Sequence, residues 1–74
     1  MSMMSEIHAA MVADGAIHGY EMDAADVALF TRALETVDPY APETPERVRN
    51  LTAARDRARA RMTRTLDAYA GAVR

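Results

Sequence analysis

The residues best suited to chemistry in this 74-residue chain are its arginines, because all nine basic residues are arginine and eight lie between residues 47 and 74. Arg57, Arg61 and Arg64 are four and three residues apart, which aligns them along one flank of an α-helix. Each guanidinium offers planar, paired N–H donors that suit a phosphate or a carboxylate. Arg55 and Arg59 fall within or beside the apolar positions of the same segment, so we expect an interface or a buried ion pair there.

Other residue types that carry catalytic or metal-binding chemistry are scarce. The absence of cysteine excludes disulfides, thiolate catalysis and cysteine-bound zinc. The two histidines, His8 and His18, form no pair at metal-ligand spacing, and serine occurs only at positions 2 and 5. There is also no glycine-rich phosphate loop. We therefore expect a protein that is not an enzyme, with no catalytic residue, no cofactor and no metal site.

A glycine-containing stretch follows the first expected helix and reads Asp14-Gly15-Ala16-Ile17-His18-Gly19-Tyr20-Glu21. This pattern resembles the second half of an EF-hand loop and a similar turn in tellurite-resistance TerB-like helical domains. The resemblance covers residues 10–21 and implies a glycine at a sharp turn, with Asp14 and Glu21 at the fifth and twelfth loop positions. Ala10 and Val12 stand where the first and third carboxylates belong, so we expect a helix–loop–helix turn that binds no metal.

Charge is strongly divided along the chain. Residues 1–46 hold nine acidic residues and one base, Arg32, for a net charge of −8, whereas residues 47–74 hold eight arginines and two acids, for +6. Three of the acids, Asp23, Asp26 and Glu35, belong to the second expected helix. The division indicates either attraction between the two halves within the fold or an anionic partner for the basic half.

The sequence predicts an all-α fold with three helices in a single helical domain spanning residues 1–74. Helix 1 is predicted at about 5–12, after Ser5 as N-cap, with Ile7 and Met11 on one face. Helix 2 is predicted at about 23–37, with Asp23 as N-cap. Its apolar stripe follows at spacings of three and four residues: Val27, Phe30, Leu34 and Val37.

A proline-rich connector over residues 38–44 separates helix 2 from a long third helix, predicted at about 45–72. Thr44 as N-cap and Pro45 in the first turn mark its start. Its apolar positions keep helical spacing to the end of the chain: Val48, Leu51, Ala54, Ala58, Met62, Leu66, Tyr69 and Val73. Helices 1 and 2 laid end to end just cover this length; otherwise the apolar segment 62–73 protrudes and needs another chain. We expect a homodimer or a partner-bound state in which Met62, Leu66, Tyr69 and Val73 form the contact.

Together these features favour a small protein–protein interaction module, such as an adaptor, an inhibitor or an antitoxin-like regulator, acting through the long arginine-rich helix. The alternative is nucleic-acid binding by Arg57, Arg61 and Arg64. The acidic first half and a sequence pI of about 5.5 argue against it, because DNA-binding domains are typically basic. No segment approaches the roughly 20 apolar residues of a membrane span, and the N-terminus lacks signal-peptide character, so we expect a cytoplasmic protein with no membrane partner.

Overall fold

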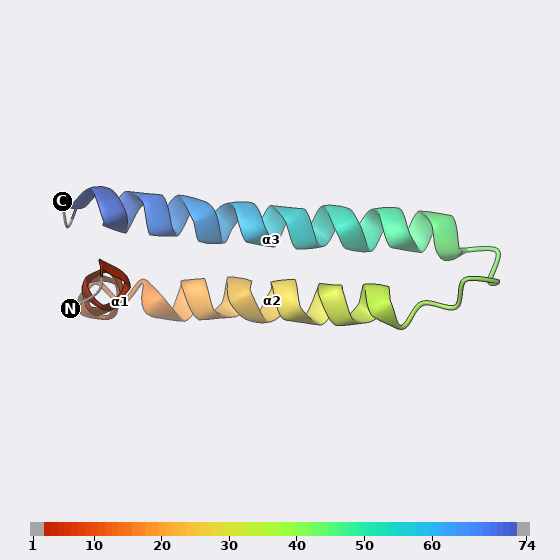
Figure 1. The fold of residues 1–74 in the computed structure, drawn as a ribbon, viewed down its shortest axis with the longest axis horizontal. Coiled ribbons are helices and arrows are strands. Elements are labelled where there is room, and N and C mark those ends of the chain that lie inside the picture. Colours follow the sequence, from red (N-terminus) through yellow and green to blue (C-terminus); the bar gives the residue numbers. More distant parts are fainter. Residues whose placement is uncertain (1–2, 73–74) are drawn as a thin grey trace.

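The computed structural model describes residues 3–72, and it is an all-α arrangement of three helices that is 84% helical. The helices are α1 (Met3–Ala13), α2 (Ile17–Glu35) and α3 (Thr44–Ala72). Figure 1 shows α2 and α3 side by side as an antiparallel hairpin, with α1 seen along its own axis at the end where α3 finishes. The predicted fold class, a short helix, a second helix, a connector and a long third helix, is confirmed.

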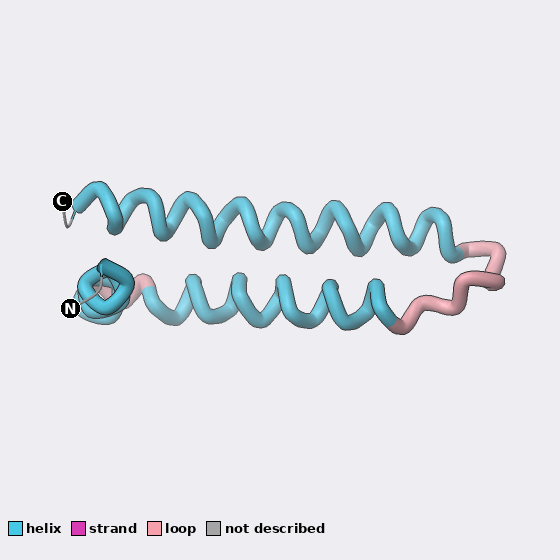
Figure 2. Tube along the Cα trace, viewed as in Figure 1, coloured by secondary structure: helices cyan, strands magenta, loops and turns pink. Residues whose placement is uncertain are grey.

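Both shorter helices pack against the long helix α3. α2 runs along α3, and α1 is turned across the hairpin (Figure 1). α1 is therefore not laid end to end with α2 along α3, but crosses the end of the hairpin and contacts α3 there (Figure 1). The resulting body is elongated, with extents of 49 × 20 × 15 Å. Figure 2 shows the two connections, a tight turn over residues 14–16 and a longer connector over residues 36–43.

The tight turn between α1 and α2 depends on Gly15, whose φ of 74° lies in the left-handed region. The Ala16 N–H donates to the Met11 carbonyl at 2.8 Å, and the Gly15 N–H donates to the Val12 carbonyl at 3.1 Å. These two bonds with a left-handed glycine form a Schellman motif, which ends a helix within one turn. The expected sharp turn is therefore present, and within three residues it redirects the chain from α1, which lies across the hairpin, into α2 (Figure 1).

The start of the second helix differs from the prediction. α2 begins at Ile17, six residues earlier than predicted, and Ala16 at its N-cap position makes no side-chain hydrogen bond. Asp23 lies inside α2, so the prediction that it caps this helix is wrong. The physical reason is the Schellman turn: because it satisfies the carbonyls of α1 so compactly, the chain enters a new helix at once. Gly19, which the sequence placed in a loop, is helical for the same reason.

The connector is organised around Asp38. Its side-chain Oδ1 accepts a hydrogen bond from the Tyr40 N–H at 2.9 Å, and its carbonyl accepts one from the Thr44 hydroxyl. The Arg47 N–H then donates to the Glu43 carbonyl at 3.0 Å, which is a helical bond of the first turn of α3. An aspartate bonding to the backbone two residues ahead favours a turn over a continued helix. These contacts order the connector and lead it into the first turn of α3.

The buried core is small. Within the described side chains, the apolar residues that are almost fully buried are Ile7 and Met11 on α1, at 3% and 2% exposed, and Ala58 on α3, at 0%. No residue of α2 is fully buried. Each member of the stripe predicted for the second helix remains partly exposed to solvent, and the last of them lies in the connector after α2: Val27, Phe30, Leu34 and Val37. Two helices packed as a hairpin bury only the side chains along their line of contact. At the end of the hairpin where α1 lies, a third helix covers more apolar surface, and Ile7 and Met11 are buried there.

Candidate interaction surface

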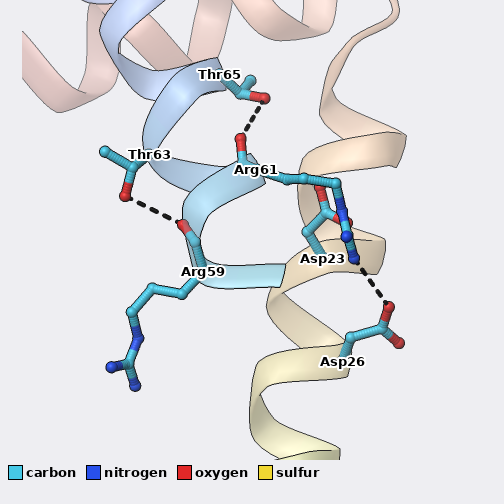
Figure 3. A network of polar contacts seen from close by, with 6 residues as sticks. All are labelled: Asp23, Asp26, Arg59, Arg61, Thr63 and Thr65. Atoms are coloured by element: carbon cyan, nitrogen blue, oxygen red, sulfur yellow. Dashed lines mark hydrogen bonds and ion pairs between the residues drawn. The ribbon is translucent and has the colours of Figure 1, made fainter. Parts of the chain in front are cut away.

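The central arginine of the predicted row takes part in the fold. The Arg61 Nε donates to Asp23 Oδ1 at 2.9 Å, and its Nη2 lies 3.8 Å from Asp26 Oδ2 (Figure 3). Both acids lie on α2, so these contacts join the basic and acidic halves of the chain. The Arg61 side chain is 44% exposed, which leaves the pair in contact with water. Arg61 is thus partly neutralised within the molecule.

The two other arginines of the row have no such partner. Arg57 and Arg64 are exposed and make no ion pair within residues 3–72. They are seven residues apart, so they lie on nearly the same side of α3, about 10 Å from each other along its axis. Exposed alanines, Ala53 and Ala60, lie between and beside them at helical spacing. We call this outward side of α3 the arginine face.

Arg55 and Arg59 take different positions. Arg55 is 26% exposed and forms a 3.3 Å ion pair with its exposed neighbour Asp56. The Arg59 side chain points away from Asp23 and Asp26 (Figure 3), and it makes no ion pair among the described residues.

The C-terminal positions predicted to contact a partner lie on the inner side of α3. Met62, Leu66 and Tyr69 share a helix face with the fully buried Ala58 and are themselves only partly exposed. The Tyr69 hydroxyl donates to Asp14 Oδ2 at 3.0 Å, which ties α3 to the turn after α1. This hydrogen bond, followed by burial and the negative charge of Asp14, raises the pKa of Tyr69 above its ordinary value. The fourth predicted residue, Val73, lies outside the described residues.

An exposed apolar surface lies on α2. Met22 is 53% exposed and Leu29 is 62% exposed, and they are seven residues apart on one helix face. Ala25 and Ala33 complete a series with spacings of three, four and four. We call Met22, Ala25, Leu29 and Ala33 the outer stripe of α2. Sequence reasoning missed it because helix 2 was predicted to start at residue 23, which left Met22 outside the helix.

Two charged residues flank the outer stripe. Glu21 and Arg32 are exposed and make no ion pair within the described part of the chain. At 100° per residue they lie about 20° apart around the axis of α2, so they share one flank. Arg32 is the base that the acidic half of the chain holds. This flank of the outer stripe therefore carries one negative and one positive charge, and Asp26, which contacts Arg61, borders the opposite flank.

A groove of about 470 Å³ opens between α2 and α3 near the connector. Phe30, Leu51 and Ala54 form its apolar part, and its rim carries two acids, an arginine and an amide: Glu43, Glu46, Arg47 and Asn50. The groove shows that the two helices alone do not close over their facing apolar residues at this end.

The accessible surface of the molecule is large for its mass. It measures 5314 Å², whereas a compact monomer of 8.1 kDa exposes about 4,500 Å². The radius of gyration of 15.7 Å likewise exceeds the roughly 11 Å expected for a compact domain of this length. The excess surface of about 800 Å² is close to what one partner contributes to a protein–protein interface of standard size.

Within residues 3–72, no three His, Cys, Asp or Glu side chains gather at a spacing that could hold a metal ion. His8 and His18 are both exposed. None of the described helices combines the length and apolar character needed to cross a bilayer.

Comparisons with protein-family models, with curated proteins and with solved structures give no match for this chain.

Proposed function

We propose that this chain is a small protein–protein interaction module whose binding surface is the exposed side of its helical hairpin. The observation that carries the proposal is the excess of about 800 Å² of accessible surface over a compact monomer. An α2 helix without a single fully buried residue supports it. A helix that keeps Leu29 and Met22 more than half exposed gains stability when another chain covers them.

The anchors and the rim of this surface are different residues. Apolar side chains that become fully desolvated supply most of the binding energy, which favours Met22 and Leu29 as anchors. Charged residues at the border set the orientation and the choice of partner, a role for Arg57 and Arg64 on the arginine face. Met62, Leu66 and Tyr69 are less suited to this role, because they are partly buried on the inner side of α3. Such a surface suits an adaptor, an inhibitor or an antitoxin-like regulator.

Site-specific photocrosslinking in the cells that naturally express this chain tests this function. A photoreactive amino acid is placed at position 29, on the outer stripe, or at position 57, on the arginine face. The matched control is position 40, because Tyr40 is 92% exposed but lies on the connector. We expect discrete protein adducts from position 29, or from both positions, and none from position 40. Absence of any protein adduct at 29 and 57 would contradict the proposal.

Nucleic-acid binding is the alternative function, and the exposed, unpaired side chains of Arg57 and Arg64 favour it. Weighing against it, Arg61 already contacts two carboxylates, so the row offers two free guanidiniums where three were expected. Non-specific binding of this kind needs several phosphate contacts and weakens steeply with salt. A gel shift at low salt that disappears in the Arg57→Gln/Arg64→Gln variant would favour the alternative, and no shift at low salt would exclude it.

A further inference from the structure

We propose that the partner of the outer stripe of α2 is a second copy of this chain, packed with its own α2 antiparallel to the first about a two-fold axis. This inference rests on the proposed function, because it names the occupant of the same exposed surface. The stripe is self-complementary, as a two-fold interface requires. Its two large residues, Met22 and Leu29, stand on either side of the small Ala25.

The axial positions of the apolar residues favour the antiparallel arrangement. When the two-fold axis passes between Ala25 and Asp26, Met22 of each copy lies opposite Leu29 of the other. The two Ala25 residues lie on one side of the axis, where they allow the helices to approach closely, and the two Asp26 side chains, each in contact with Arg61 of its own chain, lie on the other. Both large exposed side chains of the stripe are covered in this way, and each fills the space beside the other's alanine.

The charges on the flank of the stripe select the same arrangement. With the axis in this place, Glu21 of one copy lies two residues along the axis from Arg32 of the second copy, about 3 Å at the α-helical rise. Antiparallel packing also places equivalent flanks of the two helices next to each other, so the pair forms twice. A parallel arrangement would instead place opposite flanks next to each other and would keep Glu21 of one copy about 16 Å along the axis from Arg32 of the other, so the pair would not form. Charge complementarity therefore favours the antiparallel pair.

The amount of surface is consistent with this occupant. The chain exposes about 800 Å² more than a compact monomer of its mass, and a stable interface buries about that much on each partner. The arginine face cannot serve the same purpose, because two copies meeting there would bring Arg57 and Arg64 against like charges. Self-association through α2 leaves the arginine face open.

Sedimentation of the full chain tests the proposal. At about 100 µM, where even a micromolar dimer is populated, we expect a species of twice the 8.1 kDa chain mass. Leu29→Glu places two charges in the interface and should raise the dimer Kd by about 100-fold or more. Tyr40→Glu is the matched control, since it introduces the same charge at a residue that is 92% exposed on the connector, and it should leave the Kd unchanged.

A charge exchange separates this geometry from any other dimer, and it does not depend on burying a charge. Arg32→Glu and Glu21→Arg should each raise the Kd by about fivefold or more, because each creates two like-charge contacts. The double variant should return the Kd to within about threefold of the original. Arg49→Glu, which makes the same charge change on α3, should have no effect. Circular dichroism verifies that every variant keeps its helical content.

The two proposals fail in different ways. A chain that sediments as a monomer at about 100 µM overturns the self-association, even if position 29 crosslinks to another protein and the proposed function stands. A dimer whose Kd is unchanged by Leu29→Glu, or whose Arg32→Glu defect is not rescued by Glu21→Arg, overturns the α2 geometry. A monomer that also gives no crosslink at positions 29 and 57 overturns both proposals.

Discussion

The molecule has one end where three helices meet and one where only two do, and the two ends differ in what they bury. At the first, α1 crosses the hairpin and its Ile7 and Met11 are 3% and 2% exposed (Figure 1). At the connector end, Phe30 and Leu51 line an open groove instead. The residues at both ends are of similar apolar character. What differs is the presence of a third element, because an amphipathic helix needs neighbours on more than one side to bury a whole stripe.

This comparison explains why the proposed binding surface lies on α2. α1 packs against the C-terminal part of α3, the segment that the sequence had singled out as in need of a partner (Figure 1). The helix whose apolar residues remain uncovered is α2, which packs against α3 on one side and exposes Met22 and Leu29 on another. A second chain on the outer stripe would give α2 an additional neighbour on the side that faces away from α3.

The largest expected effect comes from comparing the same substitution at the two kinds of site. Met11→Ala removes a side chain that is 2% exposed and should cost about 2–5 kcal/mol of the free energy of unfolding. A domain of this size has roughly 3–5 kcal/mol in total, so this variant should be largely unfolded by circular dichroism. Met22→Ala, at 53% exposure, should change the stability of the dilute chain by less than about 0.5 kcal/mol. Equal losses at both positions would contradict the difference between the two surfaces.

The turn that places α1 across the hairpin is the next point to test. Gly15→Ala should cost roughly 1–2 kcal/mol, because Gly15 has a φ of 74° and an L side chain is disfavoured there. Gly19→Ala is the matched control: Gly19 is helical, so alanine should stabilise the chain by about 0.5–1 kcal/mol. A methyl group at either position would meet no atom within 4 Å, so urea unfolding compares backbone conformation alone. Opposite signs are expected, and a stabilising Gly15→Ala would rule out the left-handed turn.

The helical elements were well predicted from sequence where the signals were local. The apolar spacing of Ile7 with Met11 and the start signal at Thr44 gave bounds for α1 and α3 within about two residues of those observed, the usual uncertainty of helix ends. α2 was placed late because Gly15 and Gly19 appeared equivalent in the sequence. Only the hydrogen bonds of the Schellman turn distinguish the glycine that ends a helix from the one inside the next helix.

The surfaces were harder to predict, because they depend on which helix covers which face. The spacing of Arg57, Arg61 and Arg64 indicated a row on α3, but not that Asp23 and Asp26 would meet the middle one. In the same way, the apolar run at the end of α3 was visible in the sequence, whereas its coverage by α1 depends on a crossing angle that no local pattern encodes. The outer stripe of α2 could have been found from the seven-residue spacing of Met22 and Leu29.

The ion pair between the two halves of the chain should contribute less than the core or the turn. Arg61→Gln removes contacts to Asp23 and Asp26 and should cost about 0.5–1 kcal/mol, as expected for a partly exposed pair. Arg64→Gln, which removes an exposed and unpaired arginine, is the matched control and should cost less. The difference between the two variants should shrink in high salt, because salt screens charges in contact with solvent. A salt-independent difference would indicate that the pairing is not electrostatic.

The smallest expected effect concerns the contact that ties the end of α3 to the turn after α1. The Tyr69 hydroxyl donates to Asp14, and this bond, with burial and the charge of Asp14, raises the pKa of Tyr69 above the ordinary 10.0. A raised pKa means that folding favours the neutral phenol. The contribution is therefore complete below pH 10.0 and is lost as the pH rises through the raised pKa.

Urea unfolding at about pH 9 and about pH 11 measures this contribution, because the two values lie on either side of an ordinary tyrosine pKa. The original chain should lose more stability over this interval than Tyr69→Phe, which has no proton to release and no bond to Asp14. Tyr40→Phe should behave like the original chain, because Tyr40 is 92% exposed and its hydroxyl makes no hydrogen bond within the described residues. An alkaline loss as large in Tyr69→Phe as in the original chain would mean that α1 is held against α3 by Ile7 and Met11 alone.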